Sequence, residues 1–176
     1  LNMITQSSSF EAKPLLNGKS GVTGEANGKV LRFVRGTARV LSSGEPGYPV
    51  AIEQTPKSAS LLGAIRVSTE ALRQERIIAI VEGSTEVRYK IQRGENPESL
   101  VMNLRDSLWR QGLDISVYLT KDNRLVLVHN QLGSAYSFLA KSQETRLLSA
   151  RAGAFSLAQP GQDISGSIGA EPATGD

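Results

Sequence analysis

The chain has 176 residues, of which 39% are apolar, and this is enough to build the core of one ordinary domain or of two small ones. The 20 Lys and Arg residues exceed the 17 Asp and Glu residues by only three, so charge alone does not indicate a nucleic-acid partner. Cysteine is absent, which excludes disulfides, a thiolate nucleophile and a cysteine-based zinc site, and no apolar run reaches the roughly 18–20 residues of a membrane span.

Residues 1–28 are rich in Ser, Gly and Asn and show no sustained hydrophobic period, which predicts a flexible arm or linker. A β-rich part is predicted over residues 29–83. Its first strand is expected near 29–41, where "KVLRFVRGTARVL" alternates, and a short strand in "YPVAIEQ" follows the turn "SSGEPGYP". We expect these two strands to pair.

The stretch "SASLLGAIRVSTEALRQE" (58–75) is ambiguous, because Leu61, Leu62 and Ile65 have helical spacing while Gly63 and "RVST" argue against a long helix. We interpret it as a loop with at most one helical turn. The next stretch, "RIIAIVEGSTEVRYKIQR" (76–93), predicts a β-hairpin with one solvated face.

The strongest local signals surround a helix predicted near 97–111. Asn96 is a good N-cap, Pro97 suits the first helical position, and Gly112 supplies a left-handed stop. The helix carries a stripe of apolar residues within about a 100° arc that we expect to be buried: Leu100, Val101, Leu104 and Leu108.

Met102 and Trp109 point to the other side of the same helix and form a candidate interaction surface, because large exposed side chains often mark contacts with a partner. Two interpretations remain open at this point. A neighbouring domain or subunit covers the pair, or the N-terminal β-pair or the Gly-rich tail of the same chain does.

Two alternating strands around the turn "KDN" and a last strand in "AYSFLAK" follow Gly112. Residues 84–150 therefore predict a strand-helix-strand-strand-strand module of the α+β class, in which one helix covers one antiparallel sheet. Residues 151–176 predict a Gly-rich extended tail in which Ile164 and Ile168 form a short edge strand.

The catalytic inventory is sparse. His129 is the only histidine and is interpreted as a half-buried structural residue, while Asp122 and Asn123 suit a hairpin turn better than a calcium loop. No Gly-rich segment has a phosphate-loop pattern, and no strand has the aromatic signature of RNA-binding sheets. We therefore expect no enzyme, no catalytic, cofactor or metal site, no nucleic-acid binding and no membrane insertion.

Several segments resemble one known family. "VRYKI", "NPESLVMNLRDSLWRQGLDISVYL", "KDNRLVLVHN", "LGSAYSFLA" and the tail "GQDISGSIGAEPATGD" are similar to the hook-IN module of bacterial flagellins and of filament-cap, or hook-associated type 2, proteins. "GYPVAIEQTPKSASLLGA" is similar to a strand of the filament-cap proteins, which favours the cap over flagellin. The chain departs from the family where Leu108 and Trp109 replace an Ile-Asn pair and where Thr55 and Pro56 replace Leu-Ala.

The resemblance implies an outward-facing structural domain of an extracellular flagellar axial protein, exported unfolded, whose partners are other axial subunits. The chain starts at Leu1 without Met and stops at Asp176 in a Gly-rich stretch, so we expect a fragment whose polymerising terminal helices lie elsewhere. The alternative is an extracellular adhesin module that binds host glycan or mucin.

Overall fold

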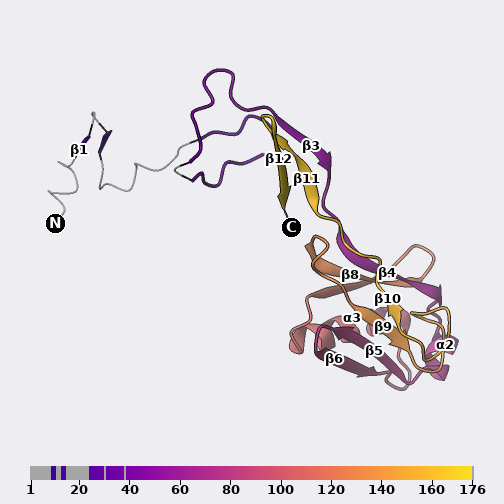
Figure 1. Cartoon of the computed structure of the whole chain (residues 1–176). Coiled ribbons are helices and arrows are strands. Elements are labelled where there is room, and N and C mark those ends of the chain that lie inside the picture. Colours follow the sequence, from indigo (N-terminus) through magenta and orange to yellow (C-terminus); the bar gives the residue numbers. More distant parts are fainter. Residues whose placement is uncertain (1–8, 11–12, 15–23, 30, 38, 176) are drawn as a thin grey trace, which may run out of the picture. The chain divides into compact units, whose positions relative to one another are not determined.

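The computed structural model describes residues 9–10, 13–14, 24–29, 31–37 and 39–175. The chain forms two compact units, Leu1–Tyr48 and Pro49–Asp176 (Figure 1). This division falls within the predicted 29–83 part. The other predicted limits, at residues 28, 83 and 150, stay predictions.

The first unit does not contain the strand predicted near 29–41. Its strands are β1 (Ser9–Phe10) and β2 (Lys13–Pro14), which pair antiparallel, and most of the predicted arm lies outside the described residues. Residues 31–37 and 39–41 carry only an isolated bridge at Gly36. Val34 and Leu41 are largely exposed, and alternation stabilises a strand only where it buries one face. The predicted pairing of this segment with "YPVAIEQ" is therefore also wrong.

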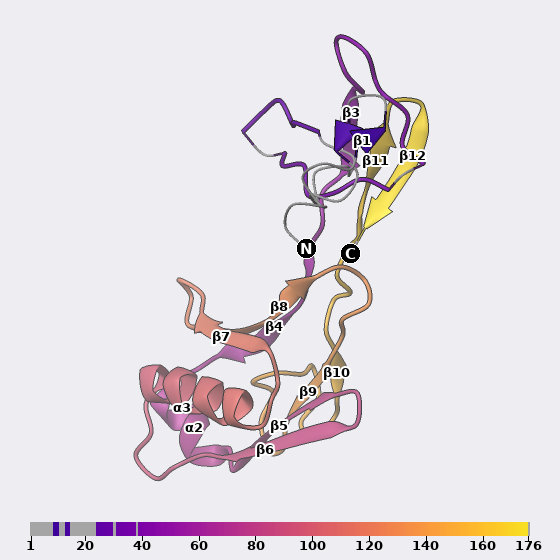
Figure 2. The same ribbon diagram turned by 90° about the vertical axis from the view of Figure 1, so that its left-hand side faces the viewer.

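The second unit contains three antiparallel sheets (Figures 1 and 2). One has the order β10 (Ser156–Leu157), β9 (Leu139–Ser142), β5 (Ile77–Glu82), β6 (Thr85–Lys90). Another has the order β4 (Ser58–Arg66), β8 (Arg124–Leu132), β7 (Ile115–Leu119), and the third has the order β12 (Glu171–Gly175), β11 (Ile164–Ile168), β3 (Val50–Gln54). The helices are α2 (Thr69–Gln74) and α3 (Pro97–Arg110).

The predicted α+β, β-rich class is confirmed, but the single sheet predicted for residues 84–150 is wrong. β7 and β8 pair as a hairpin, β8 pairs on its other side with β4, and β9 pairs with β5. Both additional pairings join segments more than 50 residues apart, which local periodicity cannot reveal. Helix α3 contacts both β6 and β7 and so lies between an edge strand of each sheet (Figure 2).

The segment predicted as a loop, 58–75, contains the nine-residue strand β4 and the short helix α2, which Ser68 caps. Every second residue of β4 from Ala59 to Gly63 is buried, and Ile65 is half-buried. A side chain at Gly63 would meet the carbonyl oxygen of Leu147 at 2.4 Å. In the sequence Gly63 argues against regular structure, but the strand requires a glycine here because the backbone of Leu147 lies against it.

Residues 151–175, predicted as an extended tail with a short edge strand, contain β10, β11 and β12, and β11 is central and not at an edge. β11 lies between β12 and β3, because Gly169, with φ of +65°, returns the chain as β12 and β3 supplies the other neighbour. A longer ribbon continues from this sheet, since Lys57 bridges Gln162 and Ser60 bridges Gln159.

The core of the second unit is formed by the β10-β9-β5-β6 sheet, the β4-β8-β7 sheet and α3. Its largest fully buried side chains include Phe138, Ile78, Ile80, Leu100, Leu104, Leu108, Leu125 and Leu127. In the part of the chain that the structure describes, no helix combines the length and apolar character that crossing a bilayer requires.

Candidate interaction surface on helix α3

Helix α3 is fixed at both ends by its own sequence. The side chain of Asn96 accepts a hydrogen bond from Ser99 N at 2.8 Å, and Ser99 Oγ accepts one from Asn96 N at 2.9 Å, which forms a reciprocal capping box after which Pro97 opens the helix. At the other end Gly112, with φ of +80°, donates to Trp109 O at 3.0 Å. These caps fix where the helix begins and ends.

The inner side of α3 carries Leu100, Leu104 and Leu108, all fully buried, while Val101 packs only partly against the core. The outer side carries Met102 and Trp109, which are 57% and 79% exposed. Because they lie seven residues apart, they project from nearly the same side of the helix. Within the second unit, the described residues leave Trp109 largely exposed.

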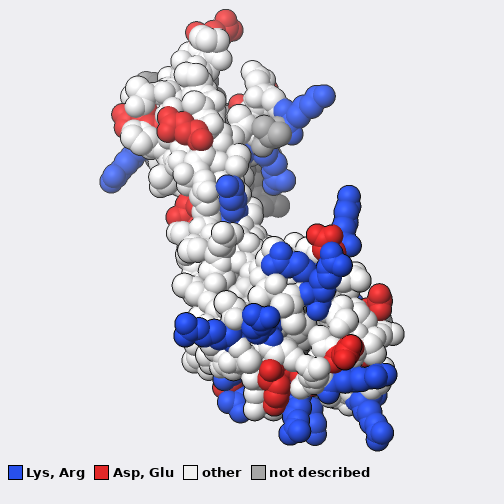
Figure 3. All heavy atoms as spheres, turned by 90° about the vertical axis from the view of Figure 1, so that its right-hand side faces the viewer, with Lys and Arg blue, Asp and Glu red and all other residues white. Residues whose placement is uncertain are grey.

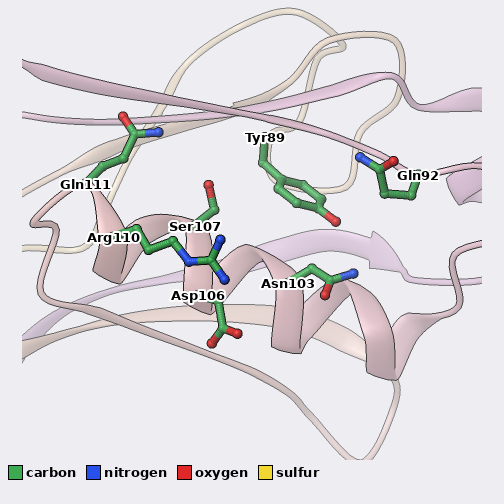
Figure 4. A pocket seen from close by; sticks show the side chains of 7 residues that line it. All are labelled: Tyr89, Gln92, Asn103, Asp106, Ser107, Arg110 and Gln111. Carbon is green, nitrogen blue, oxygen red and sulfur yellow. The ribbon is translucent and has the colours of Figure 1, made fainter.

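A groove of about 470 Å³ runs between α3 and β6 (Figure 4). Its floor and strand side are formed by Tyr89 and Gln92, and the helix side is formed by Asn103, Asp106, Ser107, Arg110 and Gln111. The lining is mainly polar and amide-rich and holds no histidine. Such a lining can bind backbone or polar groups of a partner but carries no nucleophile with an adjacent base.

The buried carboxylate of Glu95 holds one end of this groove together. It accepts hydrogen bonds from the Tyr89 hydroxyl, from Asn103 Nδ2 at 2.9 Å and from Gln92 N at 2.9 Å. Burial, followed by the hydrogen bond and charge of Glu95, raises the pKa of Tyr89, so the phenol remains a donor. The cluster ties β6 to α3.

Glu95 was not singled out from the sequence. It precedes the N-cap Asn96, a position where an apolar residue commonly packs on the helix. A glutamate there gives no periodic signal. The only available hint is the combination of a carboxyl at that position with a strand tyrosine six residues earlier.

His129 is buried, as a structural residue would be, and both of its nitrogens are engaged. Nδ1 accepts from Gln131 N at 3.0 Å, which leaves the ring proton on Nε2, and Nε2 donates to Glu82 Oε1 at 2.7 Å. The Tyr136 ring stacks on the imidazole with centroids 4.8 Å apart. No lone pair remains on the imidazole for a general base or a metal ligand.

A second groove, of about 570 Å³, opens beside His129 and includes Asp114. The carboxylate of Asp114 accepts from Asn130 Nδ2 at 2.6 Å and from Gln131 Nε2 at 2.9 Å, and these hydrogen bonds lower its pKa. Among the described residues no three His, Asp or Glu side chains gather in a way that could hold a metal ion. The polar groups here bond to one another and brace the two sheets.

Glu75 is a second buried carboxylate that the sequence did not reveal. It accepts hydrogen bonds from the backbone N–H groups of residues 76, 77, 143, 144 and 145 and from the Thr145 hydroxyl. The donors at residues 143, 144 and 145 lie in a loop about 70 residues away from Glu75 in sequence. The group is structural, since every donor belongs to the fold itself.

Charged side chains do not form a strip of one sign on the face shown in Figure 3. There Lys and Arg are spread over the lower part of the molecule with Asp and Glu between them. A nucleic-acid groove needs a continuous basic track. The exposed side of α3 and its groove are therefore the best-defined candidate for a contact with a protein partner.

The comparisons with known proteins point to one fold. No family model matches the chain, and no curated protein does. Two crystal structures of the D2-D3 domains of the flagellar cap protein FliD from Serratia marcescens are similar to it. One is 14% identical with a TM-score of 0.50, covering 76% of this chain and 81% of that chain, and the other is 16% identical with a TM-score of 0.52, covering 73% and 76%.

The chain thus has the fold of the D2-D3 domains of a flagellar cap protein. This agrees with the filament-cap side of the resemblance noted in the sequence, whereas the hook-IN module receives no support from a family model. Identities of 14% and 16% extend the similarity to the fold alone.

Proposed function

We propose that this chain is an outward-facing structural part of an extracellular flagellar axial protein of the filament-cap kind. The observation that carries the proposal is the fold similarity to the D2-D3 domains of a flagellar cap protein, which covers about three quarters of both chains. The two buried carboxylates, Glu75 and Glu95, support a structural role because their hydrogen bonds come from the fold itself. The proposed partners are other axial subunits.

Within this role, the outer side of α3 is the proposed contact with a neighbouring subunit. Trp109 and Met102 leave large apolar surfaces in water, and aromatic side chains in such positions commonly anchor interfaces. A Trp109→Ser substitution in the complete protein is expected to weaken assembly at least about tenfold without lowering the thermal stability of this chain. Lys121→Ser, on the exposed β7–β8 turn, is the matched control.

The role is tested by deleting the gene in the organism that carries it and by labelling the protein on cells. The proposal predicts loss of motility, unpolymerised flagellin in the medium, and antibody label at filament tips. Label along the whole filament would favour a flagellin-like subunit. Motile deletion cells, or label on the cell body alone, would contradict a flagellar role. Nothing in the comparisons or in the described residues supports the glycan-binding or mucin-binding alternative.

A further inference from the structure

Strand β6 has a free edge. It ends the β10-β9-β5-β6 sheet, and in the described part of the chain β5 is the only strand that pairs with it. The hairpin closes at Glu82 opposite Thr85 with a two-residue loop, so this is a hydrogen-bonded pair, and such pairs alternate along an antiparallel ladder. Ile91 N donates a hydrogen bond to Arg76 O at 3.0 Å, as this alternation of hydrogen-bonded pairs predicts.

This alternation decides which backbone N–H and C=O groups of β6 point away from β5. Odd-numbered residues of β6 bond to β5, so the N–H and C=O groups of Glu86 and Arg88 point away from the sheet. Lys90 O is taken by Gln92 Nε2 at 2.9 Å, which closes the far end of the edge. No proline and no register shift interrupts β6. The edge is thus a short, regular template for a further strand.

The groove of about 470 Å³ between β6 and α3 reaches only one end of this edge, where Tyr89 lines it (Figure 4). Glu86 and Arg88 lie outside the groove and are exposed to solvent. Because neighbouring strands are about 4.8 Å apart, a further strand would lie beside these two residues and not inside the groove.

The charges of Glu86 and Arg88, whose backbone groups point away from β5, indicate which strand would pair with β6. Glu86 and Arg88 lie on the solvent face of β6, and Arg88 Nε is 2.8 Å from Glu86 Oε1, with the side chains 65% and 37% exposed for Arg88 and Glu86. Two residues of opposite charge separated by one position are self-complementary. When such a strand is turned end to end and laid beside itself, each charge faces its opposite.

We propose that two copies of this chain pair through antiparallel β6 strands about a two-fold axis at Val87. In this register Glu86 faces the partner's Arg88 and Arg88 faces the partner's Glu86, both in hydrogen-bonded pairs. An axis at Arg88 would oppose two arginines and would need the carbonyl of Lys90, which is already bonded. The β10-β9-β5-β6 sheet then becomes one continuous sheet across the dimer. This pairing does not depend on the flagellar role.

Sedimentation velocity of the full chain tests the pairing at concentrations from about 1 to 500 µM, a range that spans weak, edge-sized interfaces. The unsubstituted chain is expected to show a concentration-dependent dimer. Glu86→Arg alone and Arg88→Glu alone each place like charges opposite each other in the homodimer, so each is expected to raise the dimer Kd at least about tenfold. Mixing the two variants restores both attractive pairs, and a heterodimer within about threefold of the original Kd is expected.

Lys90→Glu is the matched control, because Lys90 faces the neutral Ser84 of the partner in the proposed register. It leaves the Kd unchanged, whereas loss of the dimer would show that the axis lies at Arg88. A chain that stays monomeric throughout the range overturns the proposal. So does a dimer that neither single charge reversal weakens.

Cross-linking supplies a second measurement, because the chain has no cysteine of its own. Glu86→Cys mixed with Arg88→Cys puts two exposed thiols opposite each other in a hydrogen-bonded pair, where the Cα atoms lie about 5.5 Å apart, within the range of a disulfide. Mild oxidation of the mixture is expected to give a covalent dimer. Each variant alone gives little, because its own thiols are not opposite each other. Equal cross-linking of the mixture and of either variant alone, or none in the mixture, contradicts the two-fold register.

Discussion

Replacing Glu75 with Gln tests whether the buried carboxylate closes the fold. One oxygen, Oε1, accepts from the backbone N–H groups of Arg76 and Ile77 at 3.0 and 3.1 Å and from residues 143 and 144 at 3.0 and 3.2 Å. The other, Oε2, accepts from Thr145 N at 2.9 Å and Thr145 Oγ1 at 2.7 Å. Glutamine keeps the first oxygen but puts an amide NH₂ against Thr145.

The loss of stability expected for Glu75→Gln follows from these contacts. A buried N–H left without an acceptor costs about 1–3 kcal/mol, and the remaining hydrogen bonds lose the contribution of a charged acceptor. We therefore expect Glu75→Gln to lower the free energy of unfolding by about 3 kcal/mol at pH 7. Glu53→Gln, on the exposed strand β3, is the control and should change it by less than about 0.5 kcal/mol.

The pH dependence has a definite sign. Burial alone would raise the pKa of Glu75, but hydrogen bonds from Thr145, the contact with Glu144 and the backbone N–H groups outweigh it and lower the pKa below the usual 4.5. Between the two values the unfolded chain binds more protons, so stability rises with pH there. The contribution of Glu75 is fully present above about pH 4.5 and is lost as pH falls through the lower folded value.

Urea unfolding of both chains, followed by far-ultraviolet circular dichroism between pH 2 and 7, measures the effect. The difference in unfolding free energy between them isolates Glu75 from Asp114 and Asp163, whose pKa values are also lowered. The difference should shrink as the pH falls below about 4. A difference below about 0.5 kcal/mol at pH 7, or one that is independent of pH, would show that water replaces the carboxylate without loss.

Three further substitutions test the fold. Leu104→Ala removes a fully buried side chain from the inner side of α3 and should lower the free energy of unfolding by about 2–4 kcal/mol in urea titrations, while a loss below about 0.5 kcal/mol would mean that the helix phase is wrong. Gly63→Ala brings a methyl group to within 2.4 Å of Leu147 O and should cost at least about 2 kcal/mol, whereas Gly83→Ala, which meets no atom, should cost about 1 kcal/mol from its positive φ. Asn96→Ala removes the cap of α3 and should cost about 1 kcal/mol by calorimetry, and Asn96→Ser should recover most of it.

The elements that were predictable from the sequence are those whose turn, cap and stop residues lie close together in the sequence. The β5–β6 hairpin has its glycine turn between an apolar run and an alternating strand, and α3 has a cap, a proline and a glycine stop within the 17 residues from Asn96 to Gly112. The exposure of Met102 and Trp109 followed from the spacing of Leu100, Leu104 and Leu108, because this apolar stripe decides which side of the helix faces inward.

The features that escaped prediction depend on residues distant in sequence. β4 has the small residues Ala59 and Gly63 on its buried side, so the partners β8 and Leu147, and not its own hydrophobicity, make it a strand. Glu75 looks like a surface residue until residues 143–145, about 70 positions away, donate to it. The strand expected near 29–41 failed for the converse reason, because its alternating residues found no surface to cover.

The pairing of β3 with β11 joins residues more than 100 positions apart, and the ribbon beside it joins residues 57 and 60 to residues 162 and 159. A chain delivered N-terminus first, by a ribosome or through an export channel, therefore exposes β3 long before its partner arrives. Closure of this sheet must be among the last steps of folding, because the loop it closes spans nearly the whole second unit. The order of delivery leaves the edge of β3 without a hydrogen-bonding partner until β11 arrives, while Val50 and Ile52 remain 44% and 45% exposed even in the folded chain.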